Sequence, residues 1–393
     1  MIPKRILPAI VFSQFAGTSL WFAGNAIIAD LKTVMGVGID DIGIATSALQ
    51  LGFITGTLLF ALLSISDRYS PRKLFLVCSI LGAISNLLIY FIAYNLFSLL
   101  VLRFITGFFL TGIYPIGMKI ASGWYKKDLG NAIGLLVGSL VLGTAFPHLI
   151  KSFGGTIPWE QVIFIISVFS IVGGISMYLL VPDGPNISSG TRFIPKAILT
   201  IFKYKELRSS ALGYFGHMWE LYTFWALIPV ILIYYLKLNS AELNIPFWSF
   251  VIIGSGSIGC IGGGVISKKT GSAKVAFVQL AFSGFCCLVS PLMFYTSLPV
   301  FLLFLIFWGI VVAGDSPQYS AIIVLSAPKE LVGSGLTLVN SIGFAITILS
   351  LWFVYQFLGI MDIKFAMMIL GIGPILGLFS MKNLFFNESK NAF

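Results

Sequence analysis

Charge is the scarcest property of this 393-residue sequence. Only 10% of its residues are Asp, Glu, Lys or Arg, whereas an ordinary globular domain has about 25%. Histidine occurs only twice, and the four cysteines lie inside apolar runs without the spacing of metal ligands. These shortages exclude a soluble enzyme and a disordered chain. They also argue against a metalloenzyme, a structural zinc site and a disulfide framework.

Apolar residues fill the sequence in long runs. The hydrophobic fraction is 58% and the mean hydropathy is +1.00. A membrane helix needs about 20 consecutive apolar residues, because the hydrocarbon core is about 30 Å thick. The runs are continuous rather than alternating, which favours helices over β-barrel strands. The sequence therefore predicts an all-α integral membrane protein with twelve transmembrane helices, at residues 6–29, 43–65, 74–95, 98–122, 131–151, 158–182, 211–236, 245–267, 275–295, 298–325, 332–358 and 364–381.

The basic residues are divided unevenly between the two ends of these helices. In membrane proteins Lys and Arg concentrate in cytoplasmic loops. With the N-terminus inside, eighteen of the 24 basic residues lie in inner segments, four lie in outer segments and two lie within spans. The net charge of +10 is then a topology signal, which removes a nucleic-acid binder from consideration. We expect a multi-pass protein of the bacterial inner (cytoplasmic) membrane, with both termini in the cytoplasm.

The longest polar stretch, residues 183–210, separates six apolar runs from the six that follow. It is rich in Gly, Pro and Ser and carries five basic residues. Such a composition is typical of a surface segment that joins two packed domains. The sequence predicts an N-terminal six-helix bundle at 1–182, a cytoplasmic linker at 183–210 and a C-terminal six-helix bundle at 211–393.

The loop after the second run carries a charged motif made of Asp67, Arg68, Arg72 and Lys73. The motif resembles the signature of the major facilitator superfamily of secondary transporters. In that family a glycine precedes Asp-Arg-x-Gly-Arg-Arg/Lys in the loop between helices 2 and 3. This sequence departs from the signature at three positions, where it has Leu63 and Ser70 in place of glycines and Pro71 in place of an arginine.

A second family pattern, Arg-x-x-x-Gly in helix 4, is similar to Arg103 and Gly107. The six-plus-six layout extends the resemblance over essentially the whole chain. It implies two bundles that rock around a central cavity lined by helices 1, 4, 7 and 10. It also implies that the loop with Asp67, Arg68, Arg72 and Lys73 acts as a conformational latch. Residues 21–26 and 213–222 resemble a bacterial branch near the cyanate and nitrate permease-like members, and this assigns no substrate.

Charged side chains within membrane spans are candidates for function, because each costs about 2.5–3.5 kcal/mol on insertion scales. Lys119 lies near the cytoplasmic end of the fourth run, where we expect its amine to snorkel to the interface. Arg103 lies near the outer end of the same run. It either contacts substrate in the cavity or locks the bundle through a salt bridge or a carbonyl contact.

Glu220 and Asp315 are the two acids well inside the spans. Counted from the helix ends, both lie about 13–15 Å from the cytoplasmic side, at 1.5 Å per residue. A carboxylate in a medium of low dielectric binds a proton more readily than one in water. We therefore interpret the pair as a proton-coupling site, with a structural hydrogen-bond node as the alternative. His217 is three residues before Glu220, hence on the same helical face, and either relays a proton or orients that carboxylate.

Several uncharged residues are candidates for lining the cavity. The dipeptide Ser316-Pro317 next to Asp315 predicts a helix break, which frees backbone carbonyls. Aromatic residues of the seventh run line the pocket or face lipid. The neutral and aromatic candidates are Gln14, Asn25, Gln318, Tyr222 and Trp225.

The sequence predicts a secondary active transporter that moves a small solute by alternating access, with protons as the expected coupling ion. No phosphate-binding loop of an ATPase occurs in it. We expect no cofactor, no metal and no catalytic residue, and a monomer in the lipid bilayer. Two alternatives stay open at this point: a membrane sensor or receptor with a transporter fold, and a polytopic membrane enzyme.

Overall fold

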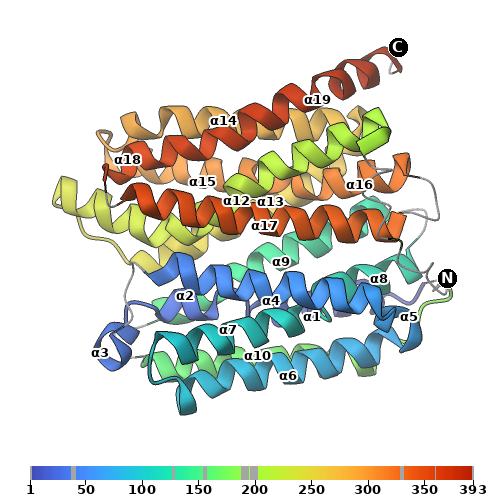
Figure 1. Ribbon diagram of the computed structural model, residues 1–393, viewed down its shortest axis with the longest axis horizontal. Helices are drawn as coiled ribbons and strands as arrows, with labels where there is room; N and C mark the ends of the chain where they lie inside the picture. Colours follow the sequence, from blue (N-terminus) through green and yellow to red (C-terminus); the bar gives the residue numbers. More distant parts are fainter. Residues whose placement is uncertain are drawn as a thin grey trace. The chain divides into compact units, whose positions relative to one another are not determined.

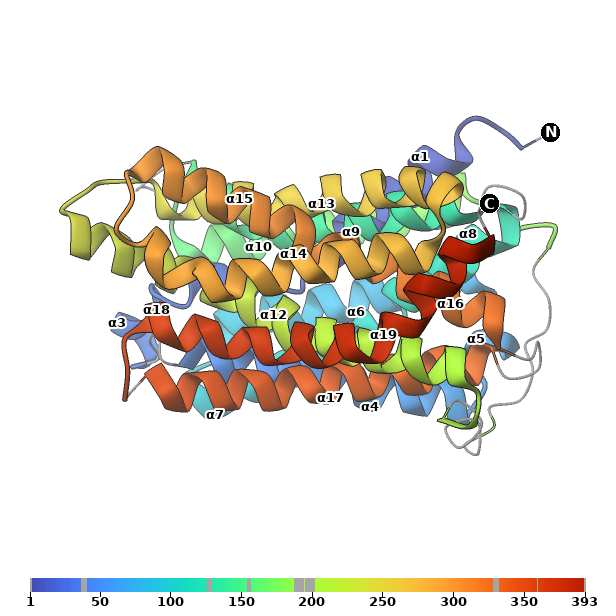
Figure 2. The same ribbon diagram turned by 90° about the horizontal axis from the view of Figure 1, so that it is seen from above.

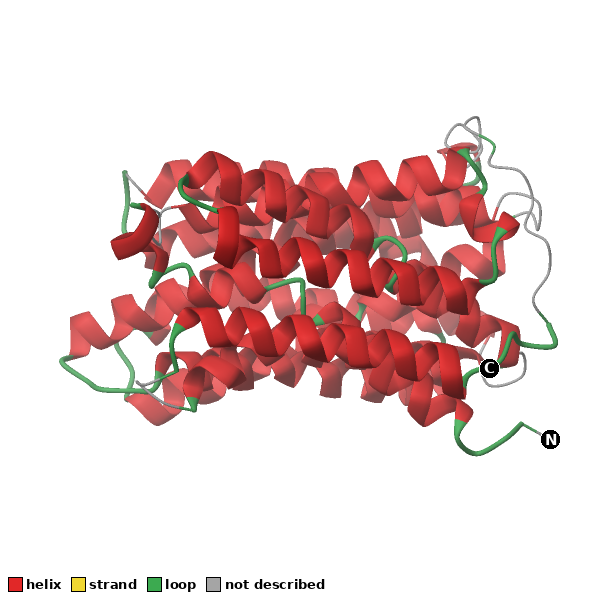
Figure 3. Ribbon diagram, turned by 90° about the horizontal axis from the view of Figure 1, so that it is seen from below, coloured by secondary structure: helices red, strands yellow, loops and turns green. Residues whose placement is uncertain are grey.

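The computed structural model describes residues 2–36, 41–125, 129–153, 157–186, 194, 202–327, 332–358 and 360–391. These residues form helices joined by short connections, and no strand occurs among them (Figures 1 and 3). Within this part of the chain, eleven helical segments are long and apolar enough to cross a membrane, and Ile6–Thr18 is a shorter apolar helix before them. The predicted all-α membrane fold is confirmed.

The chain divides into two compact units. Unit 1 comprises Met1–Arg192 with Asn244–Gly254, and unit 2 comprises Phe193–Leu243 with Ser255–Phe393. Within unit 1, α4 packs along α7 and α6 packs along α10 (Figure 1). Its helices are α1 (Ile6–Thr18), α2 (Ala23–Ile27), α3 (Leu31–Met35), α4 (Ile42–Leu62), α5 (Ile65–Arg68), α6 (Pro71–Ile92), α7 (Leu96–Leu110), α8 (Tyr114–Trp124), α9 (Leu129–Ser152) and α10 (Trp159–Leu180).

Unit 2 is built around α12, which packs against α17 and α19. Figure 2 shows α14 and α19 running side by side. One further helix, α13, begins in unit 1 and ends in unit 2. The bounds are α12 (Lys205–Asn239), α13 (Ile245–Thr270), α14 (Ser272–Met293), α15 (Leu298–Gly314), α16 (Ser316–Ser326), α17 (Val332–Leu358), α18 (Ile363–Ala366), a 3₁₀ turn (Met367–Gly371) and α19 (Ile372–Asn391).

The expectation of one continuous helix over residues 6–29 is wrong. The run forms α1, a bend over residues 19–22, and α2. Hydroxyl side chains bind the backbone at this point, since Thr18 donates to the Gln14 carbonyl and Ser19 donates to the Ala16 carbonyl. Such side-chain bonds compete with the regular helical ladder and bend a helix. The hydropathy of the run does not reveal the bend.

Two later spans are also divided. A turn before Pro115 separates α7 from α8 inside the run expected at 98–122, because proline cannot donate to the preceding turn. The junction of α15 and α16 lies at Asp315, which confirms the break predicted from Ser316-Pro317. Helix α12 begins at Lys205, earlier than the expected residue 211, so it extends into the stretch 183–210. Residues 187–193 and 195–201 of that stretch lie outside the described residues.

Glycines set how closely α4 approaches α7. A Cβ on Gly52 would overlap the Phe104 carbonyl, and a Cβ on Gly107 would overlap the Leu49 carbonyl. Small residues allow membrane helices to pack backbone against backbone. Gly107 is the glycine of the Arg-x-x-x-Gly pattern, so this pattern serves packing in unit 1.

Candidate functional site

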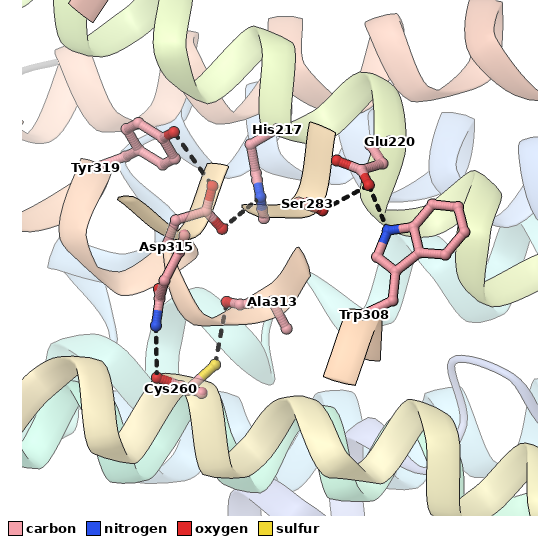
Figure 4. Close-up of polar contacts among 10 residues, drawn as sticks. His217, Glu220, Cys260, Ser283, Trp308, Ala313, Asp315 and Tyr319 are labelled. Atoms are coloured by element: carbon pink, nitrogen blue, oxygen red, sulfur yellow. Dashed lines mark hydrogen bonds and ion pairs between the residues drawn. The ribbon is translucent and has the colours of Figure 1, made fainter. Parts of the chain in front are cut away.

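A cluster of buried polar side chains in unit 2 lies where α12 meets the junction of α15 and α16 (Figure 4). Nδ1 of His217 lies 2.8 Å from Oδ1 of Asp315, and the Tyr319 hydroxyl donates to Oδ2 of Asp315 at 3.2 Å. The His217 ring also contacts the rings of Tyr214 and Tyr319, with centroids 5.8 Å apart in each case. The His217 and Asp315 side chains are each 1% exposed. Their contact therefore lies in a medium of low dielectric, where electrostatic interactions are strong.

The broken helix determines where the Asp315 side chain points. Its backbone carbonyl accepts from the backbone N–H of Gln318 at 2.9 Å, which begins the first turn of α16. The break also frees carbonyls at the end of α15. One of them, that of Ala313, accepts from the Cys260 thiol of α13 at 3.2 Å. The carboxylate thus sits at a helix junction whose backbone groups are bound by neighbouring helices.

Glu220 has a separate set of partners one turn further along α12. Its Oε1 accepts from the Ser283 hydroxyl and from Nε1 of Trp308, both at 2.6 Å (Figure 4). The Cys287 thiol also lies 3.3 Å from this oxygen. The second carboxylate oxygen, Oε2, has no hydrogen-bond partner, although the residue is buried. Three neutral donors therefore contact Oε1 of Glu220, whereas Oε2 has no such contact among the residues described.

Of the two roles expected for His217, the orienting contact with Glu220 is not formed in the described part of the chain, and the proton relay stays a prediction. The imidazole faces Asp315, and no hydrogen bond joins it to Glu220 among the described residues. Residues three apart on a helix share a face only approximately, and here each side chain meets a different neighbour. Asp315 and Glu220 share no hydrogen-bond partner in the described part of unit 2. The two carboxylates are therefore two neighbouring polar groups rather than one dyad.

The remaining candidates of unit 2 are buried. The Tyr222 ring contacts the Trp225 ring with centroids 5.1 Å apart and the Phe344 ring at 5.2 Å, so both aromatics face the helices rather than lipid. Gln318 is buried within the first turn of α16, next to Asp315. These residues stay candidates for contacting a solute.

In unit 1, Arg103 makes the carbonyl contact that was one of its two expected roles. It is fully buried, with Nη1 donating to the Leu20 carbonyl at 3.2 Å and Nη2 donating to the Trp21 carbonyl. These carbonyls belong to the bend between α1 and α2. Gly24 provides the space, because a Cβ there would meet Nε of Arg103 at 2.9 Å. The guanidinium thus stabilises the interruption of the first span.

The two neutral candidates of unit 1 differ in their surroundings. The Asn25 amide donates to the Thr46 hydroxyl at 2.8 Å, whereas its Oδ1 has no partner. Gln14 is fully buried on α1, faces Gly117 of α8, and has no hydrogen-bond partner for either amide atom. Buried amides without partners are rare in proteins, because the lost hydration is not replaced.

The charged loop of unit 1 is held together by ion pairs. Lys119 of α8 pairs with the Asp67 carboxylate and donates to the Ser66 carbonyl at 2.6 Å. The Lys119 amine, which was expected to extend to the membrane interface, is therefore bound to this loop. Nε of Arg72 lies 3.7 Å from Asp183, and its guanidinium lies over the Tyr178 ring. Arg68 and Lys73 are exposed and form no ion pair within the described residues.

Sequence reasoning missed residues that come from other helices. Tyr319 lies four residues after Asp315, a helical spacing that could have predicted the contact. Ser283 and Cys287 have the same spacing on α14, but nothing in that run points to Glu220. Gln50 is fully buried with both amide atoms unpartnered, and a lone glutamine in an apolar run is the signal that could have found it.

Comparisons with known proteins agree with this architecture. The family model described as Major Facilitator Superfamily matches residues 9–351. The chain is similar to the crystal structure of the human organic anion transporter MFSD10 (TETRAN), with a TM-score of 0.72 and 14% identity over 96% of this chain and 100% of that one. It is also similar to a bacterial homolog of the human lysosomal transporter Spinster in an inward-facing, unoccupied conformation, with a TM-score of 0.70 and 13% identity over 98% of each chain. A search of curated protein sequences gives no significant match.

Proposed function

This chain belongs to the Major Facilitator Superfamily and is a multi-pass membrane transporter, and we propose that it transports a small solute by proton-coupled alternating access. The Asp315–His217–Tyr319 group is the observation that carries the proposal. A carboxylate and an imidazole that are buried side by side form a site that can bind and release a proton inside the protein. Polar and ionisable residues at such positions in membrane proteins mark proton or substrate pathways.

The geometry supports a coupling role through the contacts that a proton would change. When Asp315 is ionised, it attracts a protonated His217 and accepts from Tyr319. When it is neutral, the ion pair is lost and the junction of α15 and α16 is held less firmly. Protonation would therefore change how α12 binds the α15–α16 junction within unit 2. A change of this kind is what couples a proton to a rearrangement of helices.

The division of the chain into two compact units supports alternating access, in which one bundle moves against another. The ion pair between Lys119 and Asp67 would act as the latch of the proposed cycle, because it fixes the loop after α4 to α8. Glu220 would serve as a second proton acceptor through its unpartnered Oε2.

Transport in proteoliposomes tests the function directly. Purified protein, reconstituted with a panel of radiolabelled small solutes, should accumulate at least one of them unmodified when a pH gradient is imposed. The same solute should exchange across the membrane in counterflow without a gradient. A sensor would bind a solute without moving it, and a membrane enzyme would release a modified product.

We propose that both termini and the stretch 183–210 face the cytoplasm. Cysteine introduced at Lys237 should react with a membrane-impermeant maleimide in intact cells, whereas cysteine at Lys269 should react only after lysis. Both side chains are exposed, and the four native cysteines are buried. Asp40 and Ser189 offer a second outside–inside pair but lie outside the described residues. Labelling of Lys269→Cys or Ser189→Cys in sealed cells would contradict the assignment.

A further inference from the structure

Arg103 is a buried cation without a carboxylate partner. It is fully buried in α7, and it takes part in none of the ion pairs in the described part of the chain. The carbonyls of Leu20 and Trp21 accept from its Nη atoms, and Nε has no hydrogen-bond partner. Carbonyl groups carry only partial negative charge. The full positive charge therefore stays uncompensated, which is unfavourable in a protein interior.

A buried glutamine faces the same bend from α4. Gln50 is fully buried, and neither Nε2 nor Oε1 has a hydrogen-bond partner. Thr46 and Phe53 lie one turn before and one turn after it, on the same face of α4. Thr46 accepts from Asn25 of α2, and the Phe53 ring contacts the Trp21 ring with centroids 5.1 Å apart. The face that carries Gln50 is thus turned toward the bend between α1 and α2.

The guanidinium of Arg103 reaches the same bend from α7, where it lies against Gly24 and donates to the Leu20 and Trp21 carbonyls. Gly52, two residues after Gln50, contacts the carbonyl of Phe104, which follows Arg103 directly. Helices α4 and α7 are therefore in backbone contact close to both residues in sequence. Arg103 and Gln50 are thus both buried and both directed to the bend, one from α7 and the other from α4.

We propose that Arg103, Gln50 and Asn25 form a subsite for the carboxylate of a small organic acid. The carboxylate supplies the negative charge that the surroundings of Arg103 lack, and it accepts from Nε2 of Gln50. The rings of Trp21 and Phe53 provide an apolar wall for the rest of the molecule. Oδ1 of Asn25, which has no partner, accepts from a donor elsewhere on the solute. The inference rests on the proposed transport function and specifies its substrate class.

Three ring compounds that differ only in their polar group test the charge preference. The thermal midpoint of the purified protein in detergent is measured with benzoate, benzamide or benzylamine at equal concentration. Benzoate should raise the midpoint by about 3–5 °C near saturation, because a ligand that binds only the folded state stabilises it. Benzamide and benzylamine should raise it by less than a third of that shift. Equal stabilisation by benzamide, or none by benzoate, would overturn the proposal.

Variants of Gln50 locate the effect. Gln50→Glu places a carboxylate of the protein in the proposed subsite, on the face of α4 turned toward the bend. It should therefore abolish the benzoate shift while the ligand-free midpoint stays level or rises. Gln50→Met keeps the volume without the amide and should weaken benzoate binding at least tenfold. Gln161→Glu adds the same charge at an exposed position of unit 1 and should leave the shift unchanged. A full benzoate shift in Gln50→Glu or Gln50→Met would refute the subsite.

The binding assay contains no proton gradient. A failure of proton coupling would leave the benzoate result intact, and a failure of the carboxylate subsite would leave gradient-driven accumulation intact. The two proposals can therefore fail separately.

Discussion

Asp315→Asn is expected to abolish solute accumulation driven by a pH gradient, down to the level of passive equilibration. Asparagine keeps the size and the hydrogen-bonding oxygen for Tyr319, but it cannot exchange a proton or form an ion pair with His217. Counterflow needs no net proton movement and should survive at least in part. Both activities are measured in the same proteoliposomes, with solute flux normalised to the amount of folded protein.

Further variants separate coupling from structure. Glu220→Gln should behave like Asp315→Asn if the two acids share the task, and His217→Ala should shift the pH dependence of uptake without abolishing it. Glu242→Gln removes an exposed acid of unit 2 and should behave as wild type. A well-folded Asp315→Asn/Glu220→Gln protein with undiminished, equally pH-dependent accumulation would end the proton-coupling proposal. Loss of both fluxes together would instead indicate a structural hydrogen-bond node.

Gly107→Ala is expected to destabilise unit 1 severely. The new Cβ would overlap the Leu49 carbonyl, which belongs to the backbone of α4 and cannot move aside as a side chain could. Overpacking typically costs about 1–3 kcal/mol and occasionally more, and an overlap with a backbone that cannot move aside lies at the upper end of this range. The thermal midpoint in detergent should fall by about 6–12 °C, as expected for a large domain.

Gly262→Ala is the matched control for this glycine. It also lies within a membrane helix, α13, but a Cβ there meets no atom within 4 Å. The midpoint of Gly262→Ala should equal that of wild type or exceed it slightly, because alanine favours the helix. An unchanged midpoint in Gly107→Ala would show that α4 and α7 can separate without cost.

The sequence by itself determined the fold class, because hydropathy and span length depend on composition along the chain and not on neighbours in space. Twelve apolar runs and the loop with Asp67 were enough to indicate the family, and Ser316-Pro317 was enough to predict the break at Asp315, since proline acts on its own helix. The bend after Thr18 was missed, because hydropathy does not register hydroxyl groups that bind their own backbone.

Only the tertiary structure decided which side chains meet. His217 and Glu220 are neighbours on α12, yet the first faces Asp315 and the second faces Trp308. Arg103 donates to two backbone carbonyls, those of Leu20 and Trp21, which lie in the bend of the first span. Helical periodicity fixes the face on which a residue lies, whereas the packing of helices distant in sequence fixes what that face touches.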